Sequence, residues 1–282
     1  MQIIDGKQIS KNIFNRLKTE FSGLNFKPVV YDVLVGDDPV SASYVGIKAK
    51  AAKVLGLEFR TLKLDSNISQ KELENRIVLI NAEQNVCGVV LQLPLPNNLD
   101  QRSALNAIQP EFDVDAMGKV CLEKFYLGQP IFIPPTVAAI WEILKSLPAE
   151  VSKKNILVIG QGELVGRPTT YFLKKQGFNV SVADSETPDI SILTKEADVI
   201  ISATGHANLI TKDIVRIGAV VIDAGTSESS GAIVGDVSVE VGQVAGFMTP
   251  VPGGVGPVTV AMLYNNVAQV AQKLNINYGQ HK

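Results

Sequence analysis

The sequence predicts an α/β protein of two domains, each with a mainly parallel sheet flanked by helices. Short β-branched runs alternate along most of the chain with segments whose apolar residues recur at helical spacing. A glycine-rich turn after residues 155–159 opens a helical segment, the order of a dinucleotide-binding βαβ unit. The length of 282 residues fits one large or two medium domains. We expect the second domain to be of the Rossmann type, with the active-site cleft between the two.

Composition narrows the class of protein. The chain is 46% apolar, so it can bury a sizeable core. Its net charge is −2, and it lacks the excess of positive charge that a nucleic acid or an anionic membrane would attract as a partner. It has no apolar run that would span a bilayer and no signal-peptide layout at its start, which predicts a cytoplasmic protein. Cys87 and Cys121 lack metal-ligand spacing, and neither His206 nor His281 has a histidine or cysteine near it in sequence. We therefore expect no metal.

The first half of the chain alternates helix and strand. The expected helices are 5–21, the segment from Pro39 onward, 69–82 and 103–108, and the expected strands are 28–35, 58–64 and 87–93. Asp38 is a suitable N-cap and Pro39 a suitable first helical residue. Tyr44 and Lys48 are four residues apart in that helix, so they share one face.

The second half begins after a polar stretch at 109–118, a plausible domain boundary. A helix is expected at 136–147, strands at 198–203 and 219–223, and a last helix at 259–274 that returns to the first domain. Residues 249–259 hold too much glycine and proline for regular structure. The predicted division is 1–118 with 259–282 as one domain and 119–258 as the other.

The βαβ unit starts with the strand 155–159 and the turn that follows it. Gly160, Gly162 and Gly166 form G-x-G-x-x-x-G, one residue longer than the usual fingerprint. Such glycines let the backbone approach a pyrophosphate at a helix N-terminus, although a glycine-rich turn without a ligand is the alternative. The second strand of the unit is expected at 179–183, and Asp184 lies at its end, where an acid receives ribose hydroxyls. Loops 204–205 and 224–226 follow further strands and are expected at the same crevice.

Five motifs carry a resemblance to a known family. They are VGDDP at 35–39 with Tyr44, Val45 and Lys48; QLPLP at 92–96; DVD at 113–115; VGDV at 234–237; and PVPGGVGPVTVAML at 250–263. In this order they resemble the bifunctional methylenetetrahydrofolate dehydrogenase/cyclohydrolase family over nearly the whole chain.

The resemblance implies a reaction and its partners. Methylenetetrahydrofolate is oxidised with NAD or NADP, and the methenyl product is hydrolysed to formyltetrahydrofolate in one-carbon metabolism, which supplies purine biosynthesis. It also implies tetrahydrofolate derivatives as ligands, a homodimer, a first domain that binds folate and a second that binds the dinucleotide. The alternatives are a monofunctional dehydrogenase, a monofunctional cyclohydrolase, and a non-catalytic dinucleotide- or folate-binding module.

The resemblance also implies roles for four residues. Lys48 is the general acid/base for the one-carbon unit, and packing beside Tyr44 and a cofactor cation is expected to lower its pKa toward neutrality. Gln92 positions Lys48, Asp115 binds the pterin ring, and Tyr44 stacks on the folate. The alternatives are a solvated surface lysine, a loop-capping amide, a turn aspartate and a half-buried packing tyrosine.

The complete predicted sets are larger. The substrate-binding set comprises Tyr44, Lys48, Gln92, Leu93, Pro94, Asp115, Gly254 and Pro257. The cofactor-binding set comprises Gly160, Gln161, Gly162, Leu164, Val165, Gly166, Arg167, Pro168, Asp184, Ser185, Ala203, Thr204, Gly205, Gly225 and Thr226.

The chain departs from the family mainly at the cofactor. The family usually has Gly-Arg-Ser at 160–162 and His-Ser at 184–185, and that arginine and serine commonly bind the extra phosphate of NADP. Here Gln161 stands at the position of the arginine and Asp184 at that of the histidine, which predicts a preference for NAD. The alternatives are an outward Asp184 with Arg167 or Lys174 binding a phosphate, and a site that has lost dinucleotide binding. The other departures are Ala116, Pro135 and Val137, which replace a usual Gly, Cys and Pro.

Overall fold

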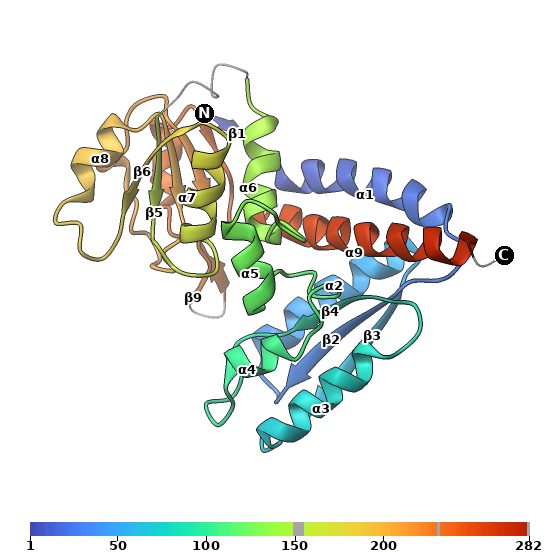
Figure 1. Cartoon of the computed structure of the whole chain (residues 1–282). Helices are drawn as coiled ribbons and strands as arrows, with labels where there is room; N and C mark the ends of the chain where they lie inside the picture. Colours follow the sequence, from blue (N-terminus) through green and yellow to red (C-terminus); the bar gives the residue numbers. More distant parts are fainter. Residues whose placement is uncertain (149–154, 230–231, 281–282) are drawn as a thin grey trace. The chain divides into compact units, whose positions relative to one another are not determined.

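The computed structural model describes residues 1–148, 155–229 and 232–280. The chain divides into two compact units. The large-sheet unit is Met1–Lys11 with Thr136–Thr259, and the small-sheet unit is Asn12–Pro135 with Val260–Lys282. Each unit contains parallel strands and flanking helices (Figure 1), which confirms the predicted α/β class.

The small-sheet unit is built on three parallel strands in the order β3-β2-β4. Their bounds are Val29–Val35 for β2, Glu58–Leu64 for β3 and Val86–Leu91 for β4. Helices α3 (Gln70–Asn81) and α4 (Gln101–Asn106) cover one face, and the apolar side chains between them and the sheet form one core cluster. Tyr31 and Val33 belong to this core cluster. Because side chains alternate along a strand, Asp32 lies on the opposite face of the sheet.

Helix α2 (Pro39–Leu55) has the predicted start. The Asp38 side chain accepts a hydrogen bond from the Ser41 backbone N–H at 2.7 Å, and Pro39 is the first helical residue. The helix ends at Gly56, whose φ of 78° is the left-handed conformation that glycine adopts without strain. The caps therefore fix the two ends of α2, and Lys48 lies on its buried face with Ser41, Val45, Ala52 and Leu55.

The last helix, α9 (Val255–Gln280), starts earlier than predicted. Pro257 is compatible with the helix because a proline in the first turn sacrifices no intrahelical hydrogen bond. Farther along, α9 joins the small-sheet unit through two buried polar side chains. The Tyr264 hydroxyl donates to the Lys48 carbonyl at 2.6 Å, and the Asn266 amide donates to the Val114 carbonyl at 2.9 Å.

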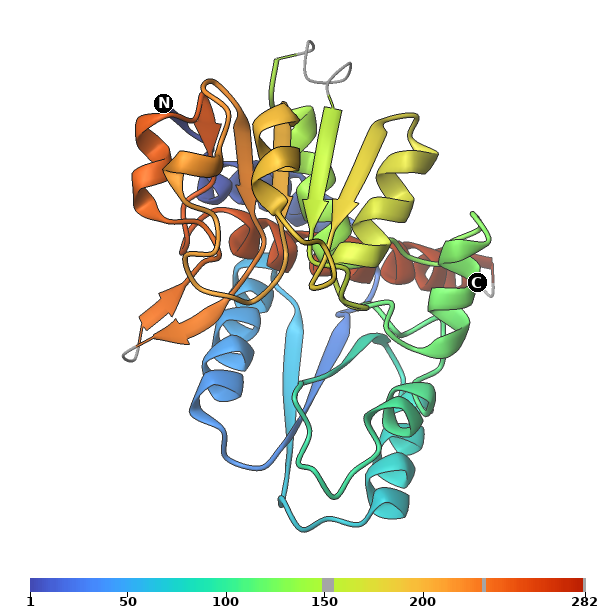
Figure 2. The same ribbon diagram turned by 90° about the vertical axis from the view of Figure 1, so that its left-hand side faces the viewer.

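The large-sheet unit contains six parallel strands in the order β1-β11-β8-β7-β5-β6 (Figure 2). The bounds are Gln2–Ile3 for β1, Asn155–Ile159 for β5, Asn179–Ala183 for β6, Val199–Ser202 for β7, Val220–Asp223 for β8 and Phe247–Met248 for β11. Helices α6 (Pro135–Lys145) and α7 (Gly166–Lys175) make contact through aromatic side chains, since the Trp141 ring lies 5.8 Å from that of Phe172. Pro135 and Val137, two of the family departures, are buried near the start of α6.

Several elements were not predicted. They are α5 (Lys119–Tyr126), α8 (Ile190–Glu196), the 3₁₀ turns η2 (Lys212–Ile214) and η3 (Val239–Gln243), and the antiparallel strands β9 (Ser227–Ser229) and β10 (Ala232–Val234). These elements are short, and short segments give weak periodic signals. Among the described residues, no helix is both long and apolar enough to cross a bilayer.

The structural units differ from the predicted domain boundaries at two places. Residues 1–11 fall in the large-sheet unit, because β1 pairs with β11. Residues 119–135 fall in the small-sheet unit, where the Lys119 backbone N–H donates to the Asn106 side chain at 2.8 Å. Both assignments depend on pairings between residues distant in sequence.

Candidate active site

Lys48 and Gln92, which the sequence predicts to act together, are hydrogen-bonded. Lys48 lies on α2 and is only 8% exposed, and its Nζ donates to Gln92 Oε1 at 2.9 Å. Gln92 directly follows β4, and its Nε2 donates to the Leu93 carbonyl at 2.8 Å. The second bond fixes the orientation of the amide, so its oxygen faces the lysine. Lys48 is therefore not a solvated surface residue.

Sequence analysis missed a third member of this cluster. Asp32, in the central strand β2, is completely buried, and its Oδ2 lies 2.6 Å from Lys48 Nζ. Burial raises the pKa of Asp32, and the charge of Lys48 and its contact oppose that rise. The expectation for Lys48 included Tyr44 and a cofactor cation but no carboxylate, and a neighbouring carboxylate stabilises an ammonium ion. An aspartate within the apolar run 29–35 was the available signal.

Asp115 lies in the segment after β4, next to a turn built around Asp113. The buried Asp113 carboxylate accepts hydrogen bonds from the backbone N–H groups of Gly118 at 2.7 Å and Met117 at 3.3 Å. Asp115 is half-buried, and burial raises its pKa to about 6 against the opposing charge of Lys48. Ala116 follows with a φ of 56°, a conformation that favours glycine. This backbone requirement accounts for the glycine that the family usually has there.

The remaining small-sheet predictions lie on the same elements. Tyr44 is half-buried on α2, one helical turn before Lys48. The Leu93 carbonyl, which accepts from Gln92, also accepts from the buried Ser41 hydroxyl at 3.5 Å. Pro94 follows through a cis peptide bond and is exposed. The segment after β4 is thus attached to α2.

The glycine-rich turn has the geometry of a dinucleotide-binding loop. Gly160 has a φ of 89°, and a Cβ there would lie 2.4 Å from the Ala203 carbonyl oxygen. A Cβ on Gly166 would lie 1.8 Å from the Gly160 oxygen, so α7 approaches the strand end closely. Gly162 is exposed, and a Cβ there would meet no protein atom within 4 Å. Internal packing therefore requires Gly160 and Gly166 and leaves Gly162 facing open space.

The predicted cofactor loops follow neighbouring strands. Ala203 and Thr204 follow β7, Gly225 and Thr226 follow β8, and Gly205 is exposed with a φ of 70°. Strands β8, β7, β5 and β6 are adjacent and parallel, so these loops share the carboxyl edge with Gly160. In open α/β sheets ligands bind at that edge.

Two buried carboxylates hold these loops, and sequence analysis gave neither a role. Asp236 Oδ2 accepts from the Ser202 hydroxyl at 2.8 Å and the Thr204 N–H at 2.7 Å. Asp223 accepts from the N–H groups of Gly225 at 3.0 Å and Val237 at 2.9 Å, and burial raises its pKa to about 6. Asp236 belongs to the VGDV motif at 234–237, which contributed to the family resemblance but whose residues were given no role.

Gln161 and Asp184, the cofactor departures, are both placed by local hydrogen bonds. Gln161 Nε2 donates to the Gly160 carbonyl at 3.0 Å and to the Thr170 hydroxyl at 3.2 Å. Asp184 is exposed after β6, and its Oδ1 accepts from the Glu186 N–H at 3.0 Å. The other predicted residues divide by exposure: Leu164, Arg167 and Ser185 are exposed, Val165 is half-buried and Pro168 is buried.

Gly254 and Pro257 belong to the large-sheet unit. A Cβ on Gly6 would lie 1.8 Å from the Gly254 oxygen, and one on Gly254 would lie 2.6 Å from the Pro250 oxygen. The segment thus packs tightly on the beginning of the chain. Pro257 lies in the first turn of α9 and is half-buried.

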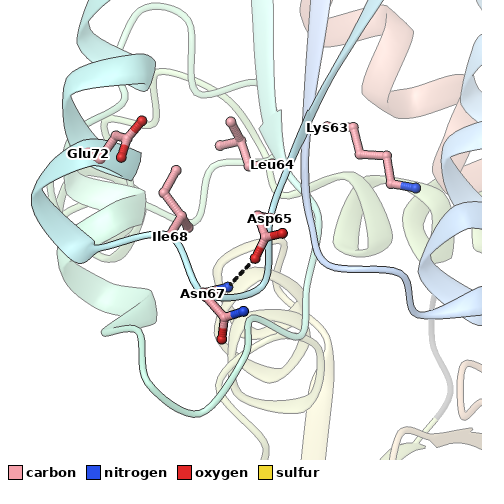
Figure 3. Close-up of a pocket in the computed structure, with 6 residues that line it drawn as sticks. All are labelled: Lys63, Leu64, Asp65, Asn67, Ile68 and Glu72. Carbon is pink, nitrogen blue, oxygen red and sulfur yellow. Dashed lines mark hydrogen bonds between the residues drawn. The ribbon is translucent and has the colours of Figure 1, made fainter.

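A surface hollow of the small-sheet unit lies away from the predicted residues. Its lining comes from the end of β3 and the start of α3: Lys63, Leu64, Asp65, Asn67, Ile68 and Glu72 (Figure 3). None of the predicted site residues lines it. Among the described residues, no group of three or more His, Cys, Asp or Glu side chains is arranged to hold a metal ion.

Together these features define a class of protein. A parallel sheet with a glycine-rich turn and strand-end loops is the framework of a dinucleotide-binding unit. A second α/β unit holds a buried lysine between a carboxylate and an amide, an arrangement suited to proton transfer. The chain has the architecture of a two-unit, dinucleotide-dependent enzyme.

Comparison with known proteins gives the family. The model described as Tetrahydrofolate dehydrogenase/cyclohydrolase, catalytic domain, matches residues 4–115. The model described as Tetrahydrofolate dehydrogenase/cyclohydrolase, NAD(P)-binding domain, matches residues 134–275. The chain belongs to the tetrahydrofolate dehydrogenase/cyclohydrolase family.

Relatives match over nearly their full length. A protein of Exiguobacterium sibiricum named Bifunctional protein FolD is 37% identical over 274 residues, which cover 96% of this chain and 99% of that protein. The protein of the same name from Staphylococcus aureus strain JH9 is 38% identical over 278 residues, 97% of each. The bifunctional FolD methylenetetrahydrofolate dehydrogenase/cyclohydrolase of Campylobacter jejuni superposes with a TM-score of 0.91 at 37% identity, covering 97% of this chain and 99% of that one.

A further solved structure is described with a cofactor. The Trypanosoma brucei methylenetetrahydrofolate dehydrogenase-cyclohydrolase, complexed with NADP and an inhibitor, has a TM-score of 0.90 at 33% identity and covers 96% of this chain and 97% of that one. Family membership confirms the resemblance and the two-domain α/β class. It also confirms that the chain is an enzyme of a family with both oxidoreductase and hydrolase activities.

Proposed function

We propose that this chain oxidises methylenetetrahydrofolate to methenyltetrahydrofolate with a nicotinamide dinucleotide and hydrolyses the product to formyltetrahydrofolate. The observation that carries the proposal is the buried Lys48–Gln92 hydrogen bond of 2.9 Å. An amine held by an amide beside a strand end is positioned for proton transfer. Lys48 is the general acid/base of the hydrolysis, and Gln92 orients it.

Other residues of the small-sheet unit bind the folate. Asp115 is a half-buried carboxylate that feels the charge of Lys48, and a carboxylate accepts two parallel hydrogen bonds from the amino and ring N–H donors of a pterin. Tyr44, one turn from Lys48, offers an aromatic ring for stacking. Leu93 and Pro94 complete the substrate set of this unit, and Gly254 and Pro257 are the remaining residues of the proposed substrate set.

The large-sheet unit binds the dinucleotide. Gly162 leaves open space at the N-terminus of α7, which suits approach of a pyrophosphate to the backbone. The bound cofactor supplies the hydride acceptor. The loops after β7 and β8 line the same sheet edge, and Asp236 and Asp223 hold them in place.

We propose that the enzyme prefers NAD to NADP. The exposed Asp184 carboxylate suits ribose hydroxyls and repels a second phosphate, and Gln161 offers no cation. Two unit charges about 4 Å apart interact by roughly 4 kcal/mol at a protein surface, enough for a preference of roughly 100-fold. Arg167 and Lys174 are exposed and are the cations that would oppose this preference.

Steady-state turnover with the two cofactors side by side tests this function. We expect oxidation of methylenetetrahydrofolate with a higher kcat/KM for NAD, and separate hydrolysis of added methenyltetrahydrofolate. Asp184→Ser with Gln161→Arg is expected to shift the preference toward NADP. An equal or higher kcat/KM with NADP contradicts the cofactor proposal, and absence of either turnover contradicts the bifunctional one. The family resemblance also supports a homodimer, which light scattering of the purified enzyme measures.

A further inference from the structure

Asp32 is an unusual neighbour for Lys48. It lies in the middle of β2 with no exposed surface, and its Oδ2 lies 2.6 Å from Lys48 Nζ. Neither carboxylate oxygen has a hydrogen-bond partner among the described residues, and the close approach of Oδ2 to Nζ is an ion pair. Buried carboxylates that are firmly ionised normally accept several hydrogen bonds. Asp32 therefore depends on Lys48 as its stabilising partner.

Structural stability gives little reason for this pair. Desolvation of two buried charges commonly offsets their attraction, and apolar residues of similar volume serve as well or better. The opposite face of β2 shows such apolar packing, since Val33 there belongs to an apolar core. Asp32 instead contacts Lys48, the proposed general acid/base of the hydrolysis.

We propose that Asp32 and Lys48 form one proton-sharing unit, in which Asp32 is the local acceptor of the Lys48 proton during hydrolysis. The proposal rests on the proposed role of Lys48. Asp32 acts through Lys48 and is a positioning residue. Gln92 Oε1, which accepts from Nζ at 2.9 Å, keeps the amine oriented while its proton count changes.

The proton balance closes within this unit. At rest Nζ is an ammonium and Asp32 a carboxylate, and transfer of one proton from Nζ to Oδ2 leaves a neutral amine and a carboxylic acid. The amine takes a proton from water as the water oxygen bonds to the methenyl carbon. The ammonium then protonates the nitrogen whose C–N bond breaks, and the hydroxyl proton of the adduct leaves to solvent as the carbonyl forms. Oδ2 finally returns its proton to Nζ.

The surrounding groups support a shared proton. Burial is the main cause of the raised pKa of Asp115, in the segment after β4, and of Tyr264, on α9, and the carboxylate of Asp32 adds to the rise of each. Burial raises the pKa of Asp32 itself. The Tyr264 hydroxyl donates to the Lys48 carbonyl, so it supplies no hydrogen bond to Asp32. In the proposal, the transferred proton is therefore shared by Lys48 Nζ and Asp32 Oδ2 alone.

The first test is the pH profile of hydrolysis by the unaltered enzyme, with the uncatalysed rate subtracted. A unit that keeps one proton across neutrality gives a nearly constant kcat between about pH 6.5 and 8.5. A kcat that rises about tenfold per pH unit through this range indicates a lysine that loses its proton to solvent, and overturns the proposal.

The second test compares Asp32→Asn with Asp32→Glu and with the control Tyr31→Phe, which changes the opposite face of β2. In Asp32→Asn the amine becomes neutral only by losing a proton to solvent. The acid limb of the profile is then expected to move up by at least about one pH unit, with a loss of at least about tenfold at pH 7. Asp32→Glu restores the plateau, and Tyr31→Phe keeps it.

The outcomes separate the alternatives. If Asp32 only stabilised the ammonium, its removal would move the acid limb to lower pH, which overturns the proposal. Equal losses of hydrolysis and dehydrogenation with an unmoved limb indicate a structural role and also overturn it. If circular dichroism shows that Asp32→Asn does not fold, the unaltered enzyme and Asp32→Glu decide. Hydrolysis that survives Lys48→Met refutes the proposed function itself and is a distinct result.

Discussion

Lys48 receives its environment from three elements: α2 carries it, β2 supplies Asp32 and the segment after β4 supplies Gln92. This explains why the lysine is buried although its helix lies at the surface of the sheet. It also changes what a substitution at this position does. Removal of the amine leaves a buried carboxylate without its cation, so catalytic and structural effects need to be separated.

The first prediction uses that separation. Lys48→Met is expected to lower methenyl hydrolysis by at least about 100-fold, because Met keeps the apolar stem and removes the amine. It is also expected to lower the free energy of unfolding by about 3–5 kcal/mol, since Asp32 loses its partner. The double variant Lys48→Met with Asp32→Val recovers stability but not hydrolysis. Denaturant unfolding and a hydrolysis assay measure the two effects, and recovered hydrolysis in the double variant contradicts the role of Lys48.

The second prediction concerns Asp115, whose pKa is raised to about 6. Its carboxylate is the proposed acceptor for the pterin, so protonation below about pH 6 removes that acceptor. Folate affinity is expected to fall as the pH is lowered through 6, by up to about tenfold per unit. Asp115→Asn weakens binding at pH 8 and loses the pH dependence. A folate Kd that follows the same pH curve in both proteins would return Asp115 to a structural role, while dinucleotide affinity is the internal control.

Gly166, the first residue of α7, and Gly162 in the turn before it are constrained differently. Gly166 packs its Cα against the Gly160 oxygen, whereas Gly162 faces open space. Sequence alone presents them as members of one motif. The structure assigns the first to packing between helix and strand end and the second to the side where a ligand approaches.

The third prediction follows from this difference. Gly166→Ala is expected to lower the free energy of unfolding by about 1–3 kcal/mol, because its Cβ would overlap a backbone oxygen that is 1.8 Å away. Gly162→Ala is the matched control, with stability unchanged or raised by up to about 1 kcal/mol and weaker dinucleotide binding. Thermal unfolding and dinucleotide titration distinguish the two. Equal destabilisation by both variants would mean that the loop is held by packing at Gly162 as well.

At the scale of the whole molecule, the end of the chain supports its proposed catalytic core. Asn266 on α9 is 2% exposed, and its Nδ2 donates to the carbonyls of Val114 at 2.9 Å and Ile133 at 3.1 Å. Val114 directly precedes Asp115. The C-terminal helix thus holds the segment that carries the proposed pterin-binding carboxylate.

The fourth prediction tests this support. Asn266→Ala is expected to lower the free energy of unfolding by about 1–3 kcal/mol, since two buried carbonyls lose their donor, and to weaken folate binding more than dinucleotide binding. Gln272→Ala on the exposed face of α9, where the side chain bonds to Glu20 at 2.9 Å, is the control and changes stability by less than about 0.5 kcal/mol. Equal losses of folate and dinucleotide affinity would indicate general destabilisation.

The sequence by itself determined the features that depend on neighbouring residues. The Asp38 cap of α2, the shared face of Tyr44 and Lys48, the strands 58–64 and 155–159, and the glycines of the nucleotide loop all followed from local pattern. A cap, a helical face and a steric requirement for glycine are set by chemistry within a few residues. The family motifs located Gln92 and Asp115 but gave no distances.

The tertiary structure alone decided which distant side chains meet. Asp32 reaches Lys48 because β2 is the central strand beneath α2, and Asp236 reaches Thr204 because the segment carrying it returns to the end of β7. Residues 1–11 join the large-sheet unit because β1 pairs with β11, far along the chain. Strand order and long-range packing set these contacts. The spacing of apolar residues along a sequence predicts strands and helices but not the order of the strands in a sheet.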